Sequence, residues 1–587
     1  MAIFTSIGSF IASAAVTYFG ASVATATAIG LGAANLTRAL AVNAFLNAIS
    51  PRPSAPKQET QANINQGAAA RTRLYGRGLL GGTRAFWETF DDYLYQLLII
   101  NHGELDGLIS YWIDGRAVTE SGGYVTDAQY TVSPPSGEPS WVRALFRDGS
   151  ANGGDFPALY TVFPTIWTTS HLLQGQATFY IRLRQPSPEA FQKMFPRQHQ
   201  TLVQAEVRGA LVYDPRTATT AYSDNAALVI LDYLTNADAM GFNLSDIDLP
   251  SFEWFADLSD EDVTLRAGGT EKRYRLWGTH TLQEPHKNVL ARMLIGCAAK
   301  LYVTAEGKIG IMGGRYADPD VTITDADIYS LEVVQSPGAL DSFNVLNGVY
   351  TSPMHGYVDT SAQAWTDDAA LLTQAERAEE MIADMVPSHG QMRRLMKNEF
   401  NRRNRRWTGR IVTNLVGIKA RFPADYVAGR GYHIIHLAAE GYDEPVEVMS
   451  HAIVADPGEA GAILWKCVMD VASVDDWLAW DAVAEEGVAP VTADLLDYVG
   501  TPIPTIALLE QFTSGSDYGI AVEVADLGRA DLVLEARIRR VGFTAWSAMT
   551  VQGLRAESIG RVLGNNYEVQ VRFAGGEWSA SSTIMIV

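Results

Sequence analysis

Cysteine and charge are both scarce in this sequence. Two cysteines, Cys297 and Cys467, stand in apolar stretches among 587 residues, which excludes a disulfide framework and the cysteine spacing of a zinc site. Two buried thiols are therefore expected. Charged residues make up 19% of the chain, and 66 acidic residues outnumber 45 basic ones, for a net charge of −21. Because phosphate binding requires cation density, this charge argues against tight nucleic-acid binding, although DNA can pass such a surface without adhering.

Catalytic and metal-binding motifs are also missing. There is no P-loop, no H-E-x-x-H and no G-x-S-x-G. His433 and His436 point to opposite faces of a strand, so they are not expected to share a metal. The acidic stretch 246–263 lacks the glycine and spacing of an EF-hand, and a solvated loop is expected there. We assign no catalytic residue, no metal site and no cofactor, and we expect the protein not to be an enzyme.

The first fifty residues carry one charge, Arg38. Residues 7–36 form an uncharged run longer than the roughly 20 residues that cross a bilayer, and no basic residue precedes it as in a signal peptide. A helix there would align one stripe of small residues, along which apolar helices pack closely; the stripe consists of Gly20, Ala24, Ala28 and Gly32. Two interpretations remain open: a helical bundle buried in a larger assembly, or a segment that enters a membrane.

The glycines Gly76, Gly78 and Gly81 have the G-x-G-x-x-G spacing of a dinucleotide-binding turn. That turn requires a buried strand before it and a helix after it. The residues before Gly76 are polar and alanine-rich, and those after Gly81 contain two strand-like apolar runs, 94–100 and 108–113, around a turn. We therefore expect the glycines to allow a tight turn between strands.

A basic stretch stands out against the acidic chain. Residues 367–406 are predicted to form a long helix broken at Pro387, with Met392, Leu395, Met396 and Phe400 on its packed face. Its cations are Arg393, Arg394, Lys397, Arg402, Arg403, Arg405 and Arg406. One interpretation is a nucleic-acid groove. The favoured interpretation is that these cations pair with acids of a neighbouring subunit or are solvated.

Other segments predict local structure by their periodicity. A turn at Asp214-Pro215 precedes a helix capped by Ser223 or Asp224, with Leu228, Val229, Leu231 and Leu234 buried. A second helix is expected over residues 285–299, followed by a hairpin turning at residues 305–307. Residues 343–353 form a further strand. In residues 499–587, Tyr567, Val569, Val571 and Phe573 alternate onto one strand face.

Several motifs resemble those of a known family. "LYGRGLLGG", "YWIDGRAV", "VRGALVYDPR" and "FNVLNGVYTSP" resemble the central tail hub of long-tailed bacteriophages, a family that includes the lambda-type host-specificity protein J and hubs of gene transfer agents. The resemblance covers about residues 71–480. Where the family usually has Pro-Gly-Asp, this chain has Pro423-Ala424-Asp425. Residues 499–587 are similar to a fibronectin type III domain, a module that binds or spaces.

The resemblance implies a mainly β fold with α+β insertions, built from tail-hub β-barrels, N-terminal apolar helices and a C-terminal β-sandwich. The implied domains are an apolar helical segment (1–50), a linker (51–70), a hub domain with hairpins and an insertion (71–200), an α+β hub domain (201–335), a second hub β-barrel region with the long helix (336–490) and the fibronectin-like domain (499–587).

The implied function is a structural hub at the distal end of a phage tail, located at the virion tail tip after assembly in the host cytoplasm. The implied homotrimer would close the tube and form the exit channel for DNA, with two barrels per chain giving a pseudo-sixfold ring. The implied partners are a distal tail protein or tail-tube ring, the tape-measure protein, other tail-tip or fibre proteins, passing DNA and the host membrane. Because the chain ends after one fibronectin-like module, host recognition is expected to belong to another protein. The alternatives are a tail-associated cell-wall hydrolase and a pore-forming membrane protein.

Overall fold

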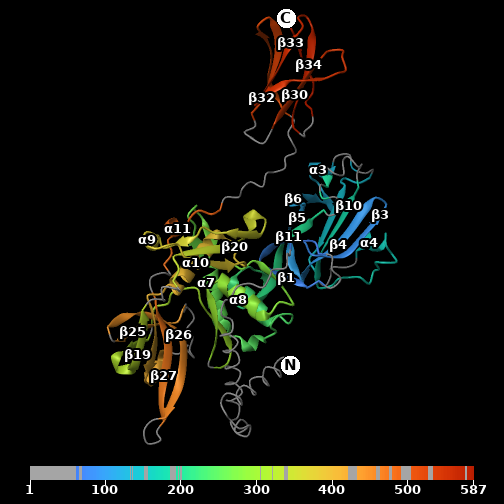
Figure 1. The fold of residues 1–587 in the computed structure, drawn as a ribbon. Coiled ribbons are helices and arrows are strands. Elements are labelled where there is room, and N and C mark those ends of the chain that lie inside the picture. Colours follow the sequence, from blue (N-terminus) through green and yellow to red (C-terminus); the bar gives the residue numbers. More distant parts are fainter. Residues whose placement is uncertain are drawn as a thin grey trace. The chain divides into compact units, whose positions relative to one another are not determined.

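The computed structural model describes residues 61–490 and 504–587, apart from residues 65–68, 132–133, 135–136, 151–155, 186–193, 196, 198–200, 305, 320, 336–341, 421–431, 440, 458–462, 475–478, 527–532 and 575–577. The small-residue stripe of Gly20, Ala24, Ala28 and Gly32 and the turn at residues 423–425 lie outside these residues. The chain divides into two compact units, Met1–Pro490 and Val491–Val587. Strand accounts for 48% and helix for 18%, which confirms the mainly β fold (Figure 1).

Two antiparallel sheets form the first part of the larger unit. One has the order β3 (Thr83–Phe90), β4 (Tyr93–His102), β10 (Gln176–Arg184), β9 (Val142–Arg147), β8 (Tyr124–Val125), β7 (Glu120–Ser121). The other has the order β12 (Thr219–Tyr222), β11 (Val203–Asp214), β5 (Leu105–Ile113), β6 (Arg116–Val118), with β2 (Arg77–Leu80) also on β11. The short helices α3 (Ala128–Thr131) and α4 (Pro157–Tyr160) lie in the connections.

The two apolar runs predicted around a turn are strands β4 and β5, but they are not paired with each other. β4 pairs with β3 and β10, whereas β5 pairs with β11 and β6. Leu98 and Ile100 of β4 and Leu105 and Tyr111 of β5 belong to one hydrophobic core. The turn thus passes the chain between two sheets, because apolar side chains of both strands are buried between facing sheets.

Helices and short strand pairs form the next part of the fold, in which α7 and α8 are drawn in green in Figure 1. The helices are α6 (Ala226–Thr235), α7 (Leu249–Ser259) and α8 (His286–Gly296), with the 3-10 turn η2 (Leu244–Asp246). The antiparallel strand pairs are β1 (Thr72–Tyr75) with β15 (Gly278–Thr281), β13 (Asp262–Thr264) with β14 (Thr270–Lys272), and β16 (Ala299–Val303) with β17 (Ile309–Gly313).

The predicted helix α6 is confirmed, and its cap is corrected. The residues predicted on its packed face are all buried: Leu228, Val229, Leu231 and Leu234. Its N-cap is Asn225, whose side chain accepts a hydrogen bond from the Ala227 amide at 3.1 Å. Asp224 is not the cap because its carboxylate binds Arg275 and accepts a hydrogen bond from the Trp277 indole at 2.8 Å.

The predicted helix over residues 367–406 is wrong before Pro387. Residues 368–371 form the short helix α9 (Asp368–Leu371), and residues 378–383 form the strand β23 (Ala378–Ala383), which pairs in parallel with β20 (Val345–Ser352). The antiparallel strands β21 (Val358–Ser361) and β22 (Trp365–Thr366) and the 3-10 turn η4 (Pro353–His355) complete this sheet region. The helix proper is α10 (His389–Arg403), and pairing with β20 overrides the helical pattern of residues 378–383.

A second six-stranded sheet ends the larger unit, shown mostly in orange in Figure 1. Its order is β18 (Thr322–Thr324), β25 (Ile434–Ala439), β26 (Tyr442–Pro457), β27 (Ile463–Ser473), β24 (Trp407–Thr413), β19 (Ile328–Gln335). The 3-10 turn η3 (Asp325–Asp327) lies between β18 and β19, and η5 (Leu415–Ala420) follows β24. The short helix α11 (Ala482–Glu485) follows β27. Both cysteines are free and buried, as predicted.

The smaller unit contains two antiparallel four-stranded sheets that share one core. The strands of the first are β28 (Ile506–Ser514), β29 (Asp517–Val524), β33 (Arg555–Arg561) and β32 (Thr550–Gln552). The strands of the second are β31 (Ser547–Ala548), β30 (Leu534–Arg540), β34 (Asn566–Phe573) and β35 (Ser582–Met585). The predicted inward face of β34 is confirmed, because Tyr567, Val569, Val571 and Phe573 are all buried.

Candidate functional site

Helix α10 lies at the meeting point of several elements of the larger unit. Its N-cap Ser388 accepts a hydrogen bond from the Gln391 amide at 3.0 Å, which satisfies one of the free amides of the first turn. Its apolar face is buried as predicted, through Met392, Leu395, Met396 and Phe400. The cations therefore emerge from a helix that the core holds in a fixed orientation.

The first half of α10 binds the segment that follows β27. The Arg393 guanidinium donates hydrogen bonds to the carbonyl oxygens of Glu485 and Glu486, and it stacks on the Trp365 ring at 4.5 Å from the centroid. The Lys397 ammonium binds the Glu485 carboxylate at 2.6 Å. Arg394 pairs with Glu271 at 2.7 Å. These contacts hold residues 485–486 and β14 against the helix.

The C-terminal end of α10 meets a buried carboxylate. The side chain of Glu447, on β26, is 2% exposed and pairs with three cations: Lys300 of β16, Arg402 of α10, and Arg405 just beyond the helix. Burial alone would raise the pKa of Glu447, but the three cations hold it well below its ordinary value. Burial also lowers the pKa of Lys300. We call Glu447 and these three cations the Glu447 cluster; it connects the second six-stranded sheet to α10 and β16.

The predicted partners of the basic helix require a correction. All seven predicted cations have carboxylate or carbonyl partners in the same chain. Five are described above; of the other two, Arg403 pairs with Glu379 and Arg406 pairs with Glu444. Pairing with a neighbouring subunit is therefore not needed to satisfy them. A groove that binds nucleic acid needs cations free to release counterions on phosphate contact, and these cations already have carboxylate or carbonyl partners within the fold.

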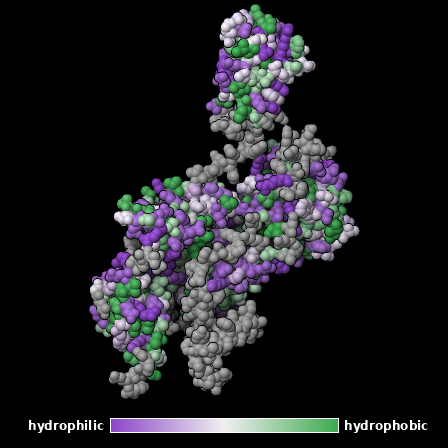
Figure 2. Space-filling view, in the orientation of Figure 1, coloured by the Kyte–Doolittle hydropathy of each residue, from purple (hydrophilic) through white to green (hydrophobic). Residues whose placement is uncertain are grey.

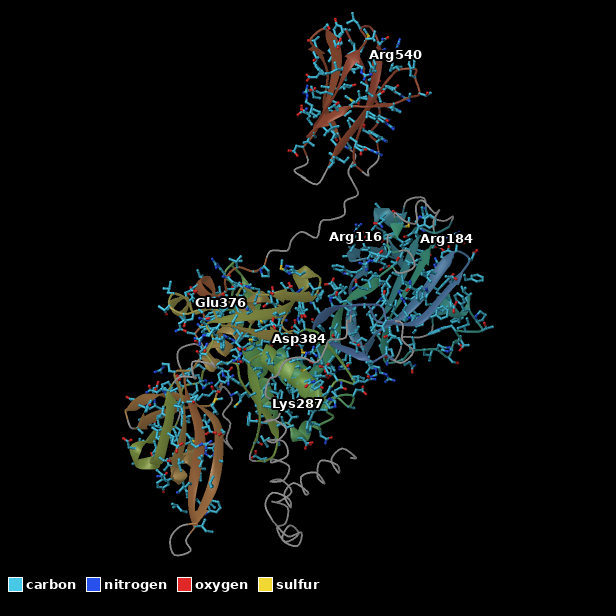
Figure 3. The ribbon with its side chains drawn as sticks, viewed as in Figure 1. Arg116, Arg184, Lys287, Glu376, Asp384 and Arg540 are labelled. Atoms are coloured by element: carbon cyan, nitrogen blue, oxygen red, sulfur yellow. The ribbon has the colours of Figure 1, made fainter. Side chains whose placement is uncertain are left out.

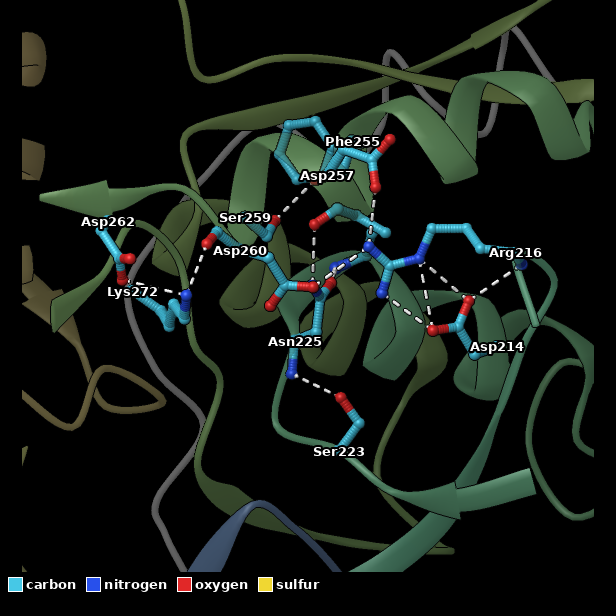
Figure 4. Close-up of polar contacts among 12 residues, drawn as sticks. Asp214, Arg216, Ser223, Asn225, Phe255, Asp257, Ser259, Asp260, Asp262 and Lys272 are labelled. Atoms are coloured by element: carbon cyan, nitrogen blue, oxygen red, sulfur yellow. Dashed lines mark hydrogen bonds and ion pairs between the residues drawn. The ribbon is translucent and has the colours of Figure 1, made fainter. Parts of the chain in front are cut away.

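The acidic stretch 246–263 also differs from its prediction. It folds largely as α7 rather than as a solvated loop, and its carboxylates pair with cations. Arg216 binds Asp214 at 2.8 Å, Asp257 at 2.8 Å and Asp260 at 3.1 Å (Figure 4). The hydrogen bonds from Arg216 lower the pKa of Asp214. This cluster fixes the β11–β12 turn to α7, which is a structural role.

Charged side chains join elements elsewhere in the larger unit as well (Figure 3). Asp384, which follows β23, accepts a hydrogen bond from the Arg292 side chain of α8 at 2.8 Å. Glu206 of β11 accepts hydrogen bonds from Tyr357, at 2.7 Å, and from Ser110, at 2.7 Å. These pairs join α8 to the end of β23 and join β11 to β5 and to Tyr357.

The glycine motif forms a turn between strands, as predicted. Gly76 stands between β1 and β2 with φ +65°, and no helix follows at β2. A Cβ atom at Gly76 would lie 2.6 Å from the Leu276 carbonyl oxygen, and one at Gly81 would lie 2.5 Å from that of Ala62. The glycines are required because other chain segments approach the backbone closely.

The histidines have separate environments. His433 donates to the Ala420 carbonyl oxygen at 2.6 Å, and His436 hydrogen-bonds with Asp443 at 2.7 Å. His280 is buried against Tyr75 and Tyr233, and burial lowers its pKa to about 3. Within the part of the chain that the structure describes, no group of three or more His, Cys, Asp or Glu residues is placed to hold a metal ion.

One hairpin extends beyond its sheet. β25 pairs with residues 442–447 of β26, and β24 pairs with residues 467–472 of β27. Residues 450–457 pair with residues 463–470 of β27, and no other described strand pairs with 450–457 or with 463–466. We call residues 450–457 and 463–466, with Met449, the hairpin arm. Its exposed apolar side chains are Met449, Ile453, Val454, Ile463, Leu464 and Trp465, each at least 40% exposed.

The outermost strand of the same sheet is also partly apolar. β19 pairs with β24 along one edge, and no described strand lies along its other edge. Tyr329 and Val334 on this strand are 53% and 65% exposed. Hydrophobic residues are visible on the surface of this region (Figure 2). Clustered exposed apolar side chains and open strand edges are typical of protein interfaces.

Sequence reasoning missed the Glu447 cluster and the hairpin arm. The sequence does place Glu447 between Val446 and Val448 in a strand. A buried charge there is costly unless it is paired, so this pattern could have predicted a buried ion pair. No helix of the described residues has the length and apolar character needed to cross a membrane. The charge clusters join elements of the fold, and the hairpin arm and β19 expose apolar side chains.

Comparison with known proteins finds similarity of structure without similarity of sequence. No protein-family model matches the chain, and no curated protein matches it. A chain from the virion of a native gene transfer agent particle aligns with a TM-score of 0.50 and 14% sequence identity, covering 81% of this chain and 98% of that chain. The 43 kDa tail protein of prophage MuSo2 from Shewanella oneidensis aligns with a TM-score of 0.24 and 10% identity, over 68% of this chain and 91% of that chain. The chain therefore shares its fold with a protein of a gene transfer agent virion.

Proposed function

We propose that this protein is a structural component of a phage-like tail, the central hub at its distal end. The observation that carries the proposal is the fold shared with the gene transfer agent virion chain across 98% of that chain. The sequence motifs of the hub family support the same assignment independently. The interior charge clusters also fit a structural role, because their side chains are committed to joining elements.

In this proposal, three copies surround the exit channel for DNA and close the tube before infection. The net charge of −21 per chain disfavours adhesion of DNA to the channel wall. The N-terminal apolar segments, with the stripe of Gly20, Ala24, Ala28 and Gly32, pack together in the lumen and enter the host envelope on ejection. The fibronectin-like module docks other tail-tip or fibre proteins, and the hub domains contact the distal tail ring and the tape-measure protein.

Particles provide the test of location and of the N-terminal segment. A gold-labelled antibody against this chain is expected to mark the tail tip in electron micrographs. Particles whose hub lacks residues 1–49 are expected to keep that label and to adsorb, yet to lose DNA transfer. Label on the head or along the tail tube would contradict the hub assignment. Normal DNA transfer by the truncated particles would contradict the role of the segment alone.

The hairpin arm is the proposed contact between copies. The arm of one copy lies along the open edge of β19 in the next; the β26 part of the arm, residues 450–457, and β19 each have eight residues. Because the arm and the edge of β19 are two different surfaces of one chain, the contact is head-to-tail, and its repetition around an axis generates a ring when the rotation closes. Strand addition at an open edge supplies main-chain hydrogen bonds, and the apolar side chains supply burial.

Aspartate in the arm is expected to prevent this assembly. The double variant Ile453→Asp, Trp465→Asp places two charges in the contact, where burying an unpaired charge is unfavourable, and we expect monomers in sedimentation velocity runs at concentrations where the wild type is trimeric. Leu372→Asp is the matched control, because Leu372 is 87% exposed and lies outside the arm. Trimers of the arm variant would refute this contact while leaving the tail location untouched.

A further inference from the structure

Residues 479–488 lie against helix α10 just before the chain enters the smaller unit, which begins at Val491. We call them the strap. The structure describes all of these residues, and Ala482 alone among them is buried, whereas Val483 and Val488 are 70% and 64% exposed. Burial of apolar surface is the usual source of packing stability. Because the strap buries so little of it, hydrogen bonds and ion pairs must hold the strap in place.

Arg393 of α10 is the centre of these contacts. Its guanidinium donates hydrogen bonds to two carbonyl oxygens of the strap, those of Glu485 (2.8 Å) and Glu486 (3.1 Å). It also donates to the carbonyl oxygens of Gln363 (2.9 Å) and Ala364 (2.8 Å), which lie between β21 and β22. A guanidinium presents five donors in a fixed planar fork. One side chain therefore binds both segments at once.

The burial of Arg393 makes these bonds costly to break. Arg393 is 7% exposed, and burial lowers its pKa to about 10, so it is still charged at neutral pH. A buried cation is tolerated only when its donors have acceptors. If the strap detached, donors of this cation would lose their acceptors, and that loss costs more than the loss of an exposed pair.

Other contacts hold the strap at both of its ends. At the first end, the Lys397 ammonium donates to the Ala479 carbonyl oxygen. At the other end, the Val488 amide donates to the side-chain oxygen of Gln363 at 2.6 Å. Gly487 has φ +75°, and a Cβ atom there would overlap the same oxygen, so glycine is required for this close approach. The strap is thus fixed over its whole length.

We propose that the strap is a mechanical anchor, through which a pull on the smaller unit is borne by α10. Without the strap, a pull would act directly on the end of β27 and break the hydrogen bonds of that strand one after another. With the strap, the pull first meets the bonds of Arg393, which share the force because they must break together. Helix α10 can bear this force because its apolar face is buried in the core. The inference goes beyond the proposed tail location and does not depend on it.

Single-molecule pulling tests the anchor in the full chain. Both native cysteines are buried, so Lys287→Cys, at an exposed position of α8 (Figure 3), can carry one handle and the C-terminus the other. Release of the strap is expected to add about 35 Å of chain, since an extended residue spans at most about 3.6 Å. Arg393→Lys keeps the charge but loses the fork. We expect the strap to release about tenfold faster at a given force in this variant, because at least one hydrogen bond to a charged group is lost.

Two further variants separate the anchor from general damage. Arg410→Lys is the matched control, because Arg410 pairs with Asp470 and both side chains are exposed, at 58% and 43%; its release rate is expected to equal that of the wild type. Gly487→Ala changes the strap and leaves α10 intact, and it is also expected to speed release. Equal rates in the wild type and Arg393→Lys would overturn the proposal. The absence of a step of about 35 Å before the larger unit unfolds would overturn it as well.

Discussion

Replacing Glu447 with glutamine is expected to lower the free energy of unfolding of the larger unit by about 3–5 kcal/mol, measured by urea denaturation. The carboxylate is 2% exposed and is shared by Lys300, Arg402 and Arg405. Glutamine has nearly the same shape but no charge, so three cations would remain together without the anion that they share. The cost of an uncompensated buried charge, and not the loss of packing, is therefore the quantity measured.

The matched control for Glu447 is Asp470→Asn. Asp470 pairs with Arg410 at 2.8 Å on the same sheet, but the two side chains are 43% and 58% exposed, and exposed pairs contribute about 0–1 kcal/mol. If both variants lost the same stability, the Glu447 cluster would have no special role.

Acid titration gives an independent check of the Glu447 cluster. The pKa of Glu447 in the folded protein lies below its ordinary value, which is about 4.3 in an unfolded chain. A lowered folded pKa means that the carboxylate contributes its full stability above pH about 4.3 and loses it as pH falls towards the folded pKa. The difference between wild type and Glu447→Gln is therefore expected to be the same at pH 7 and pH 5 and to shrink below about pH 4.

Alanine at Gly76 is expected to cost about 2–4 kcal/mol of stability, the sum of left-handed backbone strain and overpacking. Gly76 has φ +65°, and an added Cβ would meet the Trp277 ring and the Leu276 carbonyl oxygen, the latter at 2.6 Å. The backbone cannot withdraw easily, because the Gly209 amide donates to the Gly76 carbonyl oxygen at 2.6 Å. Thermal unfolding measured by calorimetry would report the loss.

Gly115 is a control glycine that also has a positive φ but has open space around it. Its φ is +83°, and a Cβ there would have no atom within 4 Å. Gly115→Ala is therefore expected to show the strain alone, about 1–2 kcal/mol. Equal losses at the two glycines would mean that the close approach of residues 276–277 contributes nothing.

Local periodicity in the sequence was sufficient to predict the buried faces of several helices and strands. The buried face of α6 and the inward side of β34 follow from repeats of 3.6 and 2 residues, which need no knowledge of the partner element. The glycine turn at residue 76 followed from the polar residues before it and the strand-like residues after it. These features depend on neighbours within a few positions in the chain.

Long-range pairing decided the features that the sequence did not predict. Residues 378–383 have a helical pattern, yet they form β23 because β20, some thirty residues earlier, offers a free edge. The cations of α10 were predicted to face solvent or another subunit, but their partners are Glu271, Glu447 and Glu485. Spacing along the chain carries no signal for pairs separated by 45 to 123 residues.

The sequence by itself determined the β-rich class, the buried cysteines, the acidic character and the packed faces of individual helices and strands, because each depends on composition or on short repeats. Only the tertiary structure determined which groups the charged side chains pair with. It pairs the cations of the basic helix inside the fold, since buried cations need polar partners wherever the chain brings them, and it leaves the hairpin arm exposed, because its strands extend past the last partner that could cover them.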